Sequence, residues 1–171
     1  MNKEYKRLII FLVIFLVFVA CFVLYLAWPL LTGDTIILAT TPVDPLDFFR
    51  GQYLIIRYDI GTIPAILGVS PGDGVYVALK KDDNGISRYA ARSLSNKFKL
   101  DFNPKVIRGT VKSVYGESMT VEYGIEQYFF ERNAEINSRG MLVEARVSVS
   151  GGARIVKLLD REGNDLEIEY A

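Results

Sequence analysis

The feature that most constrains this chain is a long uncharged run near its N-terminus. Residues 8–31 are apolar or uncharged throughout. As a helix, at about 1.5 Å per residue, the run would span roughly 36 Å, enough for a hydrocarbon core of about 30 Å. We therefore expect a transmembrane anchor helix at residues 8–31, in contact with the lipid bilayer.

The charged residues before this run predict the orientation of the chain. Positively charged flanks of a membrane helix stay in the cytoplasm. Residues 1–7 are therefore expected to form a cytoplasmic N-terminus and residues 32–171 an extracytoplasmic domain, in a single-pass protein of the cell membrane. Basic side chains outnumber acidic ones in the flank: Lys3, Glu4, Lys6 and Arg7.

Two processed forms compete with a permanent anchor. A cleaved signal peptide has a shorter apolar core followed by a site of small residues, and no such site follows Trp28 and Pro29. A lipoprotein would be modified at Cys21, but Cys21 lies inside the apolar run, and Phe18 stands where an aliphatic residue is usual. We favour an uncleaved signal anchor, with Pro29 marking the helix exit or a kink.

The composition excludes several classes of site. The chain has no histidine, one cysteine, and twenty acidic against twenty basic residues. This removes histidine-dependent catalysis, histidine zinc sites, internal disulfides and CxxC motifs. A net charge of zero disfavours nucleic-acid binding, which needs an excess of positive charge. We expect no catalytic residue, no metal and no cofactor.

Residues 32–171 have the pattern of one β-rich domain. Their apolar segments are short and rich in β-branched and aromatic residues. This predicts a mainly β fold, an antiparallel β-sandwich or a small barrel-like domain. A short helix is an option at residues 62–67 or 128–137. The expected strands cover residues 35–38, 53–58, 74–79, 87–92, 106–114, 118–123, 141–149, 153–159 and 166–170.

Turn signals separate these strands. Pro71, Gly72 and Asp73 precede one strand, and Asn84-Gly85 suits the positive φ of hairpin turns. We expect three antiparallel hairpins, with turns at residues 82–85, 115–117 and 150–152.

The densest group of turn-forming and charged residues lies at residues 41–58. Its spacing resembles the signature of the GDYXXLXY family, small membrane-anchored bacterial proteins of uncharacterised function. The chain departs from that signature at Leu46, Gln52 and Ile56. The matching residues are Pro42, Val43, Asp44, Pro45, Asp47, Arg50, Gly51, Tyr53 and Tyr58.

A second motif supports the same resemblance. Residues 123–129 are similar to the family's Tyr-Gly-Ile/Leu-Glu-x-Tyr-Phe segment. The two motifs and the anchor together extend along the whole chain, but the resemblance implies no particular chemistry, because the family has no established activity. The matching residues are Tyr123, Gly124, Glu126, Tyr128 and Phe129.

The first motif has a structural and a metal-binding interpretation. Its carboxylates could hold a divalent cation, together with Asp59. In the structural interpretation, which we favour, Asp47 caps a helical turn at residues 46–49 that ends at Gly51 with positive φ, and Arg50 pairs with Asp44 or Asp47. Gln52 in place of the family aspartate also disfavours a catalytic or metal-binding role.

Other groups have weaker functional interpretations. A histidine-free hydrolase would need a Ser-Lys dyad, and the nearby pairs are Ser95 with Lys97 and Ser113 with Lys112. Strand neighbours point to opposite faces, which disfavours the second pair. The strand tyrosines fit sheet packing better than a ligand or glycan platform. A solvated strand face is expected for Glu117, Glu122 and Glu126.

These observations predict a non-catalytic accessory or assembly subunit. Its extracytoplasmic β domain would dock on an integral membrane protein partner. The residues at 44–51 would act as a membrane-proximal latch that orders the start of the domain, with Phe48 or Phe49 facing the core or the partner. A ligand-sensing or cell-wall-binding module is the alternative.

Overall fold

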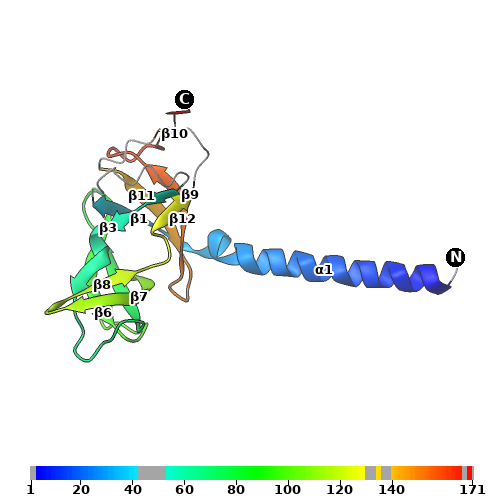
Figure 1. Ribbon diagram of the computed structural model, residues 1–171, viewed down its shortest axis with the longest axis horizontal. Coiled ribbons are helices and arrows are strands. Elements are labelled where there is room, and N and C mark those ends of the chain that lie inside the picture. The colour runs from blue at the N-terminus through cyan, green and yellow to red at the C-terminus, as the bar shows by residue number, and fades with distance from the viewer. Residues whose placement is uncertain (1–2, 42–52, 130–133, 136–139, 167–168, 171) are drawn as a thin grey trace.

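A long helix extends away from a β-rich domain in the computed structural model (Figure 1). Helix α1 covers Lys3–Thr32, and its described side chains up to Tyr25 are all exposed. The stretch Glu4–Tyr25 is long and apolar enough to cross a membrane. The structure describes residues 3–41, 53–129, 134–135, 140–166 and 169–170.

The helix joins the domain almost without a linker. It continues past Pro29 to Thr32, so Pro29 does not end it. Only Gly33 separates it from strand β1, Asp34–Thr41. At the start of β1, Lys105 Nζ lies 2.5 Å from Asp34 Oδ1. The first strand of the domain therefore begins where the helix stops.

Strand β1 lies inside a four-stranded antiparallel sheet. The order is β12-β11-β1-β3, with β11 at Leu142–Val147, β12 at Ala153–Leu159 and β3 at Arg57–Tyr58. The ladder between β1 and β11 runs from Asp34↔Val147 to Ala39↔Leu142. Buried side chains alternate along both strands, so one face of this sheet is turned to the core.

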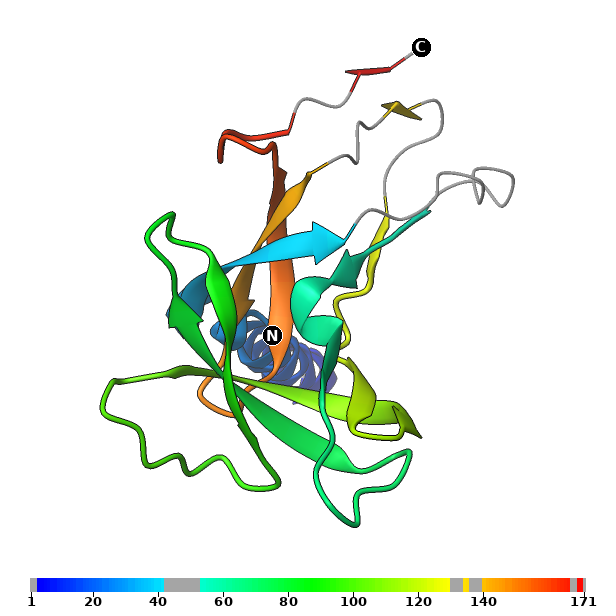
Figure 2. The same ribbon diagram turned by 90° about the vertical axis from the view of Figure 1, so that its left-hand side faces the viewer.

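The second sheet has five antiparallel strands in the order β4-β8-β7-β5-β6. Most of it lies below the four-stranded sheet in Figure 2. Two short pairs complete the described strands: β2 (Tyr53–Ile55) with β9 (Gln127–Phe129), and β10 (Ala134–Glu135) with β13 (Glu169–Tyr170). The five strands are β4 Thr62–Pro64, β5 Gly74–Lys81, β6 Ser87–Ser93, β7 Lys105–Tyr115 and β8 Ser118–Glu122.

One hydrophobic core is shared by the two sheets. Both sheets contribute side chains that are almost fully buried, and apolar burial of this kind supplies most of the favourable free energy of folding. The largest of them are Ile36, Leu38, Ile56, Ile107, Met119 and Leu159.

The mainly β, antiparallel fold confirms the expected class. The three expected hairpins form, and the turn glycines Gly85, Gly116 and Gly151 have positive φ, at 79°, 55° and 87°. Residues 166–170 were expected to form one strand; Leu166 lies outside any strand, Glu169–Tyr170 form β13, and residues 167–168 lie outside the described chain.

Where the chain is described, the two helix options were wrong. Residues 62–64 form strand β4 against β8, and residues 127–129 form β9 against β2. A 3₁₀ turn, Asp59–Gly61, stands just before β4. Pairing with distant strands satisfies the backbone hydrogen-bonding groups of these short segments. An isolated helical turn would do this less well, because helices this short are marginally stable on their own.

Candidate functional site

The two sequence motifs meet in space, although about 65 residues separate them along the chain. We call residues 53–61 and 123–129 together the motif joint. The expected strand 53–58 is interrupted here: β2 pairs with β9, whereas β3 pairs with β1. At the interruption, the Ile56 amide donates to the Glu126 carbonyl at 2.8 Å. The first motif therefore changes partner strands within the joint.

Two buried tyrosines close the joint reciprocally. The Tyr58 hydroxyl donates to the Ile125 carbonyl at 2.5 Å, and the Tyr123 hydroxyl donates to the Ile60 carbonyl at 2.7 Å. Each half of the joint thus supplies one ring and accepts one hydrogen bond from the other half. Both residues are about 95% buried, with 4% and 5% of their surface exposed. Buried hydroxyls and carbonyls without partners would be costly, so the four groups depend on each other.

The surroundings keep both hydroxyls protonated. Burial raises the pKa of Tyr58 far above its ordinary value, and the negative charge of Glu126 raises it further. Burial likewise raises the pKa of Tyr123, with smaller contributions from Glu126 and Tyr89. The hydroxyls act as hydrogen-bond donors at every physiological pH, and their geometry suits fold closure rather than proton transfer.

Glu126 holds the turn between the two tyrosine contacts. Its carboxylate accepts from the Tyr123 amide at 2.5 Å and from the Gly124 amide at 2.9 Å. Gly124 has a φ of +79°, a conformation that side chains other than glycine rarely adopt. The interpretation of Glu126 as part of a solvated strand face was wrong, because its carboxylate is hydrogen-bonded to these two backbone amides.

The other two glutamates of that group are exposed, as expected. Glu122 pairs with Lys112 across the β7–β8 ladder. Lys112, the proposed partner of Ser113 in a dyad, is therefore engaged in an ion pair. At the other candidate pair, it is the backbone amide of Lys97 that donates to Ser95 Oγ, at 3.4 Å.

Gly109, which was not among the predicted site residues, makes room for the joint. A Cβ added at Gly109, in β7, would lie 2.3 Å from Val121 Cγ1, 2.9 Å from the Glu122 carbonyl oxygen and 3.0 Å from Tyr123 Cδ1. Strand β8 and the Tyr123 ring approach the β7 backbone too closely for any side chain. A glycine inside an apolar strand pattern is the sequence signal of such an approach.

The outer end of the joint carries an exposed aromatic side chain. In the β2–β9 ladder, Tyr53 stands opposite Phe129 and Leu54 opposite Tyr128. Tyr128 is half-buried against the core, whereas Phe129 is 70% exposed. Phe129 matches the second motif but was not predicted to be a site residue.

Most of the first motif lies outside the described residues. This applies to Pro42, Asp44, Pro45, Asp47, Arg50 and Gly51, and to the expected helical turn with Phe48 and Phe49. The positive φ expected at Gly51 also remains a prediction. The two ends of the segment are described: Thr41 ends β1, and Tyr53 begins β2.

The acidic residue proposed to join those carboxylates is engaged elsewhere. Asp59 Oδ2 lies 2.5 Å from Arg88 Nη1, and Asp59 Oδ1 accepts from the Thr41 hydroxyl at 3.3 Å. In the part of the chain that the structure describes, no group of three or more acidic or cysteine side chains is placed to hold a metal ion.

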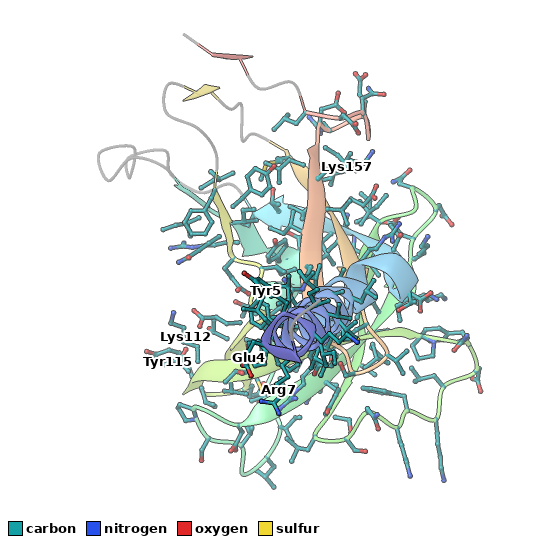
Figure 3. All side chains as sticks on the ribbon, turned by 90° about the vertical axis from the view of Figure 1, so that its right-hand side faces the viewer. Glu4, Tyr5, Arg7, Lys112, Tyr115 and Lys157 are labelled. Carbon is teal, nitrogen blue, oxygen red and sulfur yellow. The ribbon has the colours of Figure 1, made fainter. Side chains whose placement is uncertain are left out.

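The tyrosines do not gather on one surface within the described chain. Tyr58 and Tyr123 are buried, while Tyr115 is 77% exposed at the tip of the β7–β8 hairpin. Figure 3 shows Tyr115 and Lys112 at the edge of the molecule, to one side of α1. This distribution fits sheet packing better than a glycan platform.

Comparison with known families gives one match. The family model described as GDYXXLXY protein matches residues 15–158, most of the helix and nearly all of the domain. No curated protein and no solved structure matches the chain.

Proposed function

The chain belongs to the GDYXXLXY family, and we propose that it is a non-catalytic, membrane-anchored accessory or assembly subunit. In this proposal, α1 spans the bilayer once, with its basic N-terminal flank in the cytoplasm. The β domain lies on the extracytoplasmic side and docks on an integral membrane protein.

The anchoring part of the proposal is supported by the helix and its junction. Among the described residues, the apolar side chains of the helix from Leu8 to Tyr25 are exposed, and lipid is the medium that suits them. Because Gly33 alone separates α1 from β1, the domain would be held directly at the bilayer surface. Diffusion would then be confined to two dimensions, beside other membrane proteins.

One observation supports a non-catalytic role more than any other. Tyr58, Tyr123 and Glu126 carry groups that could perform chemistry, and all three are committed to backbone hydrogen bonds within the motif joint. Each of these bonds closes the fold. These three signature residues are then explained by the architecture of the domain.

A candidate partner contact follows from the same joint. Phe129 is exposed at its outer end, beside the first motif segment. Exposed aromatic side chains are enriched at the centres of protein interfaces. We assign the partner-facing role to this end of the joint.

Site-specific photo-crosslinking in the native membrane tests this function. A photo-crosslinking phenylalanine replaces Phe129 in the tagged full-length chain. The matched control carries it at Tyr115, which is similarly exposed but lies at the tip of the β7–β8 hairpin instead of in β9. We expect one integral membrane protein to crosslink from position 129 and not from position 115.

Two outcomes would contradict the proposal. Equal crosslinking from both positions would indicate random encounters in the membrane rather than docking. Crosslinking to cell-wall fragments in place of a protein would favour the alternative, a cell-wall-binding module.

A further inference from the structure

The turn between β11 and β12 lies beside the exit of α1. Strand β11 runs antiparallel to β1, and Val147 at its end stands opposite Asp34 at the start of β1. Residues 148–152 continue beyond this level, and α1 contacts β11. In Figure 1 this turn, drawn in orange, hangs on the side of the domain from which the helix extends.

The turn is held firmly in place. The Ser148 amide donates to the Gly152 carbonyl at 2.9 Å, and the Gly151 amide donates to the Ser148 carbonyl at 2.8 Å. The Arg108 amide of β7 donates to the Gly151 carbonyl at 2.8 Å. A Cβ at Gly151 would lie 2.9 Å from Arg108 Cβ, so the turn packs closely on the second sheet.

An apolar side chain stands at the tip of this rigid turn. Val149 is 98% exposed. Its neighbours Ser148 and Ser150 bond to each other through their hydroxyls at 2.9 Å, so these two side chains are satisfied within the turn. A fully exposed β-branched residue contributes nothing to the core, and turns are usually built from polar residues.

Positive charge accompanies this tip. Arg146 of β11 stands directly opposite Arg154 of β12, and their neighbours Ala145 and Val147 point into the core. Both arginines therefore lie on the outer face of the sheet. Arg154, at an exposed position on that face, can contact an anion such as a lipid phosphate.

We propose that the β11–β12 hairpin is a second membrane contact, which binds the headgroups of anionic phospholipids. Val149 enters the boundary between headgroups and acyl chains, and Arg154 contacts lipid phosphate. This inference rests on the proposed anchoring of α1. The helix and the hairpin together would fix the orientation of the domain on the bilayer.

Fluorescence quenching of the full-length protein in vesicles tests the contact. In a Cys21→Ala background, Val149→Cys and, as control, Tyr115→Cys carry the same environment-sensitive dye. The vesicles contain phosphatidylcholine with or without phosphatidylglycerol, and lipids with a nitroxide on the headgroup serve as quenchers. We expect severalfold stronger quenching at position 149 than at position 115, stronger still with phosphatidylglycerol, and weakened by Arg154→Glu.

A parallel sample separates this inference from the anchor. The unmodified chain carries the dye on Cys21, in the middle of α1. Quenching of this dye by acyl-chain nitroxides, together with equal quenching at positions 149 and 115, would overturn the hairpin contact alone. A Cys21 dye that lipid nitroxides do not quench would overturn the anchor, and the hairpin contact with it.

Discussion

The motif joint and the β11–β12 turn are held together by the same kind of hydrogen bond, but they differ in where they place their side chains. Each ties segments that are distant in sequence by hydrogen bonds to backbone carbonyls, at Ile60 and Ile125 in the joint and at Gly151 in the turn. The joint places its tyrosine side chains in the interior. The turn leaves Val149 exposed. The signature residues Tyr58 and Tyr123 therefore build the fold, whereas Val149 does not.

The largest effect is expected where the joint has least room. Gly109→Val should destabilise the protein by about 3 kcal/mol or more, because the new side chain collides with β8 and with the Tyr123 ring. Gly61→Ala is the control, since its nearest obstacle is 4.0 Å away. Denaturant unfolding measures both, and equal effects of the two substitutions would contradict the close approach at Gly109.

Alkaline pH should lower the stabilising contribution of the motif joint, whereas that of the β11–β12 turn should not change. The pKa of Tyr58 and of Tyr123 is raised in the folded state, so their stabilising contribution is complete below about pH 10, the ordinary tyrosine pKa, and declines above it. The unfolded chain releases these protons first. Each group adds a slope of up to about 1.4 kcal/mol per pH unit.

Unfolding free energies measured from neutral to alkaline pH check this dependence. The Tyr58→Phe, Tyr123→Phe double variant should show a shallower decline than the wild type, since it lacks both titrating groups. Parallel declines in the two proteins would mean that neither hydroxyl is shielded from solvent as described.

A smaller effect is expected at Glu126. Glu126→Gln should cost about 1 kcal/mol, because a neutral amide accepts the hydrogen bonds from the Tyr123 and Gly124 amides less strongly than a carboxylate does. Glu117→Gln, at an exposed position, should lie within about 0.5 kcal/mol of the wild type. Thermal unfolding of the pair distinguishes a turn-holding carboxylate from a solvated one.

The smallest effect on stability is expected at the turn. Val149→Ser should change the free energy of unfolding by less than about 0.5 kcal/mol, because the side chain packs against nothing. A loss comparable to that of a buried valine would show that Val149 supports the fold, and its exposure would then need another explanation.

Local signals predicted much of the fold. An uncharged run predicts a long apolar helix whatever follows it, and residues such as Gly85 and Gly116 predict turns because their conformation is set locally. The segment at residues 53–58 was predicted as one strand because its apolar pattern is continuous. The interruption at Ile56 depends on two partners, β9 and β1, that no local pattern reveals.

The candidate site shows the same limit. The resemblance selected Tyr58, Tyr123 and Glu126 individually, yet their mutual contacts depend on how two distant motifs pair. Glu126 was grouped with its exposed neighbours because strand alternation ignores the turn at Gly124. Phe129 was recognised as part of the second motif, but its exposure, and with it a contact role, could not be predicted from residue type alone.

The free energy of unfolding of the Tyr58→Phe, Tyr123→Phe double variant tests the central claim most directly. If the signature tyrosines close the fold, each lost hydroxyl leaves a buried carbonyl without a partner and costs about 1–3 kcal/mol, while Tyr115→Phe costs almost nothing. A double variant as stable as the wild type would contradict the account, because the hydroxyls would then serve something other than the architecture of the domain.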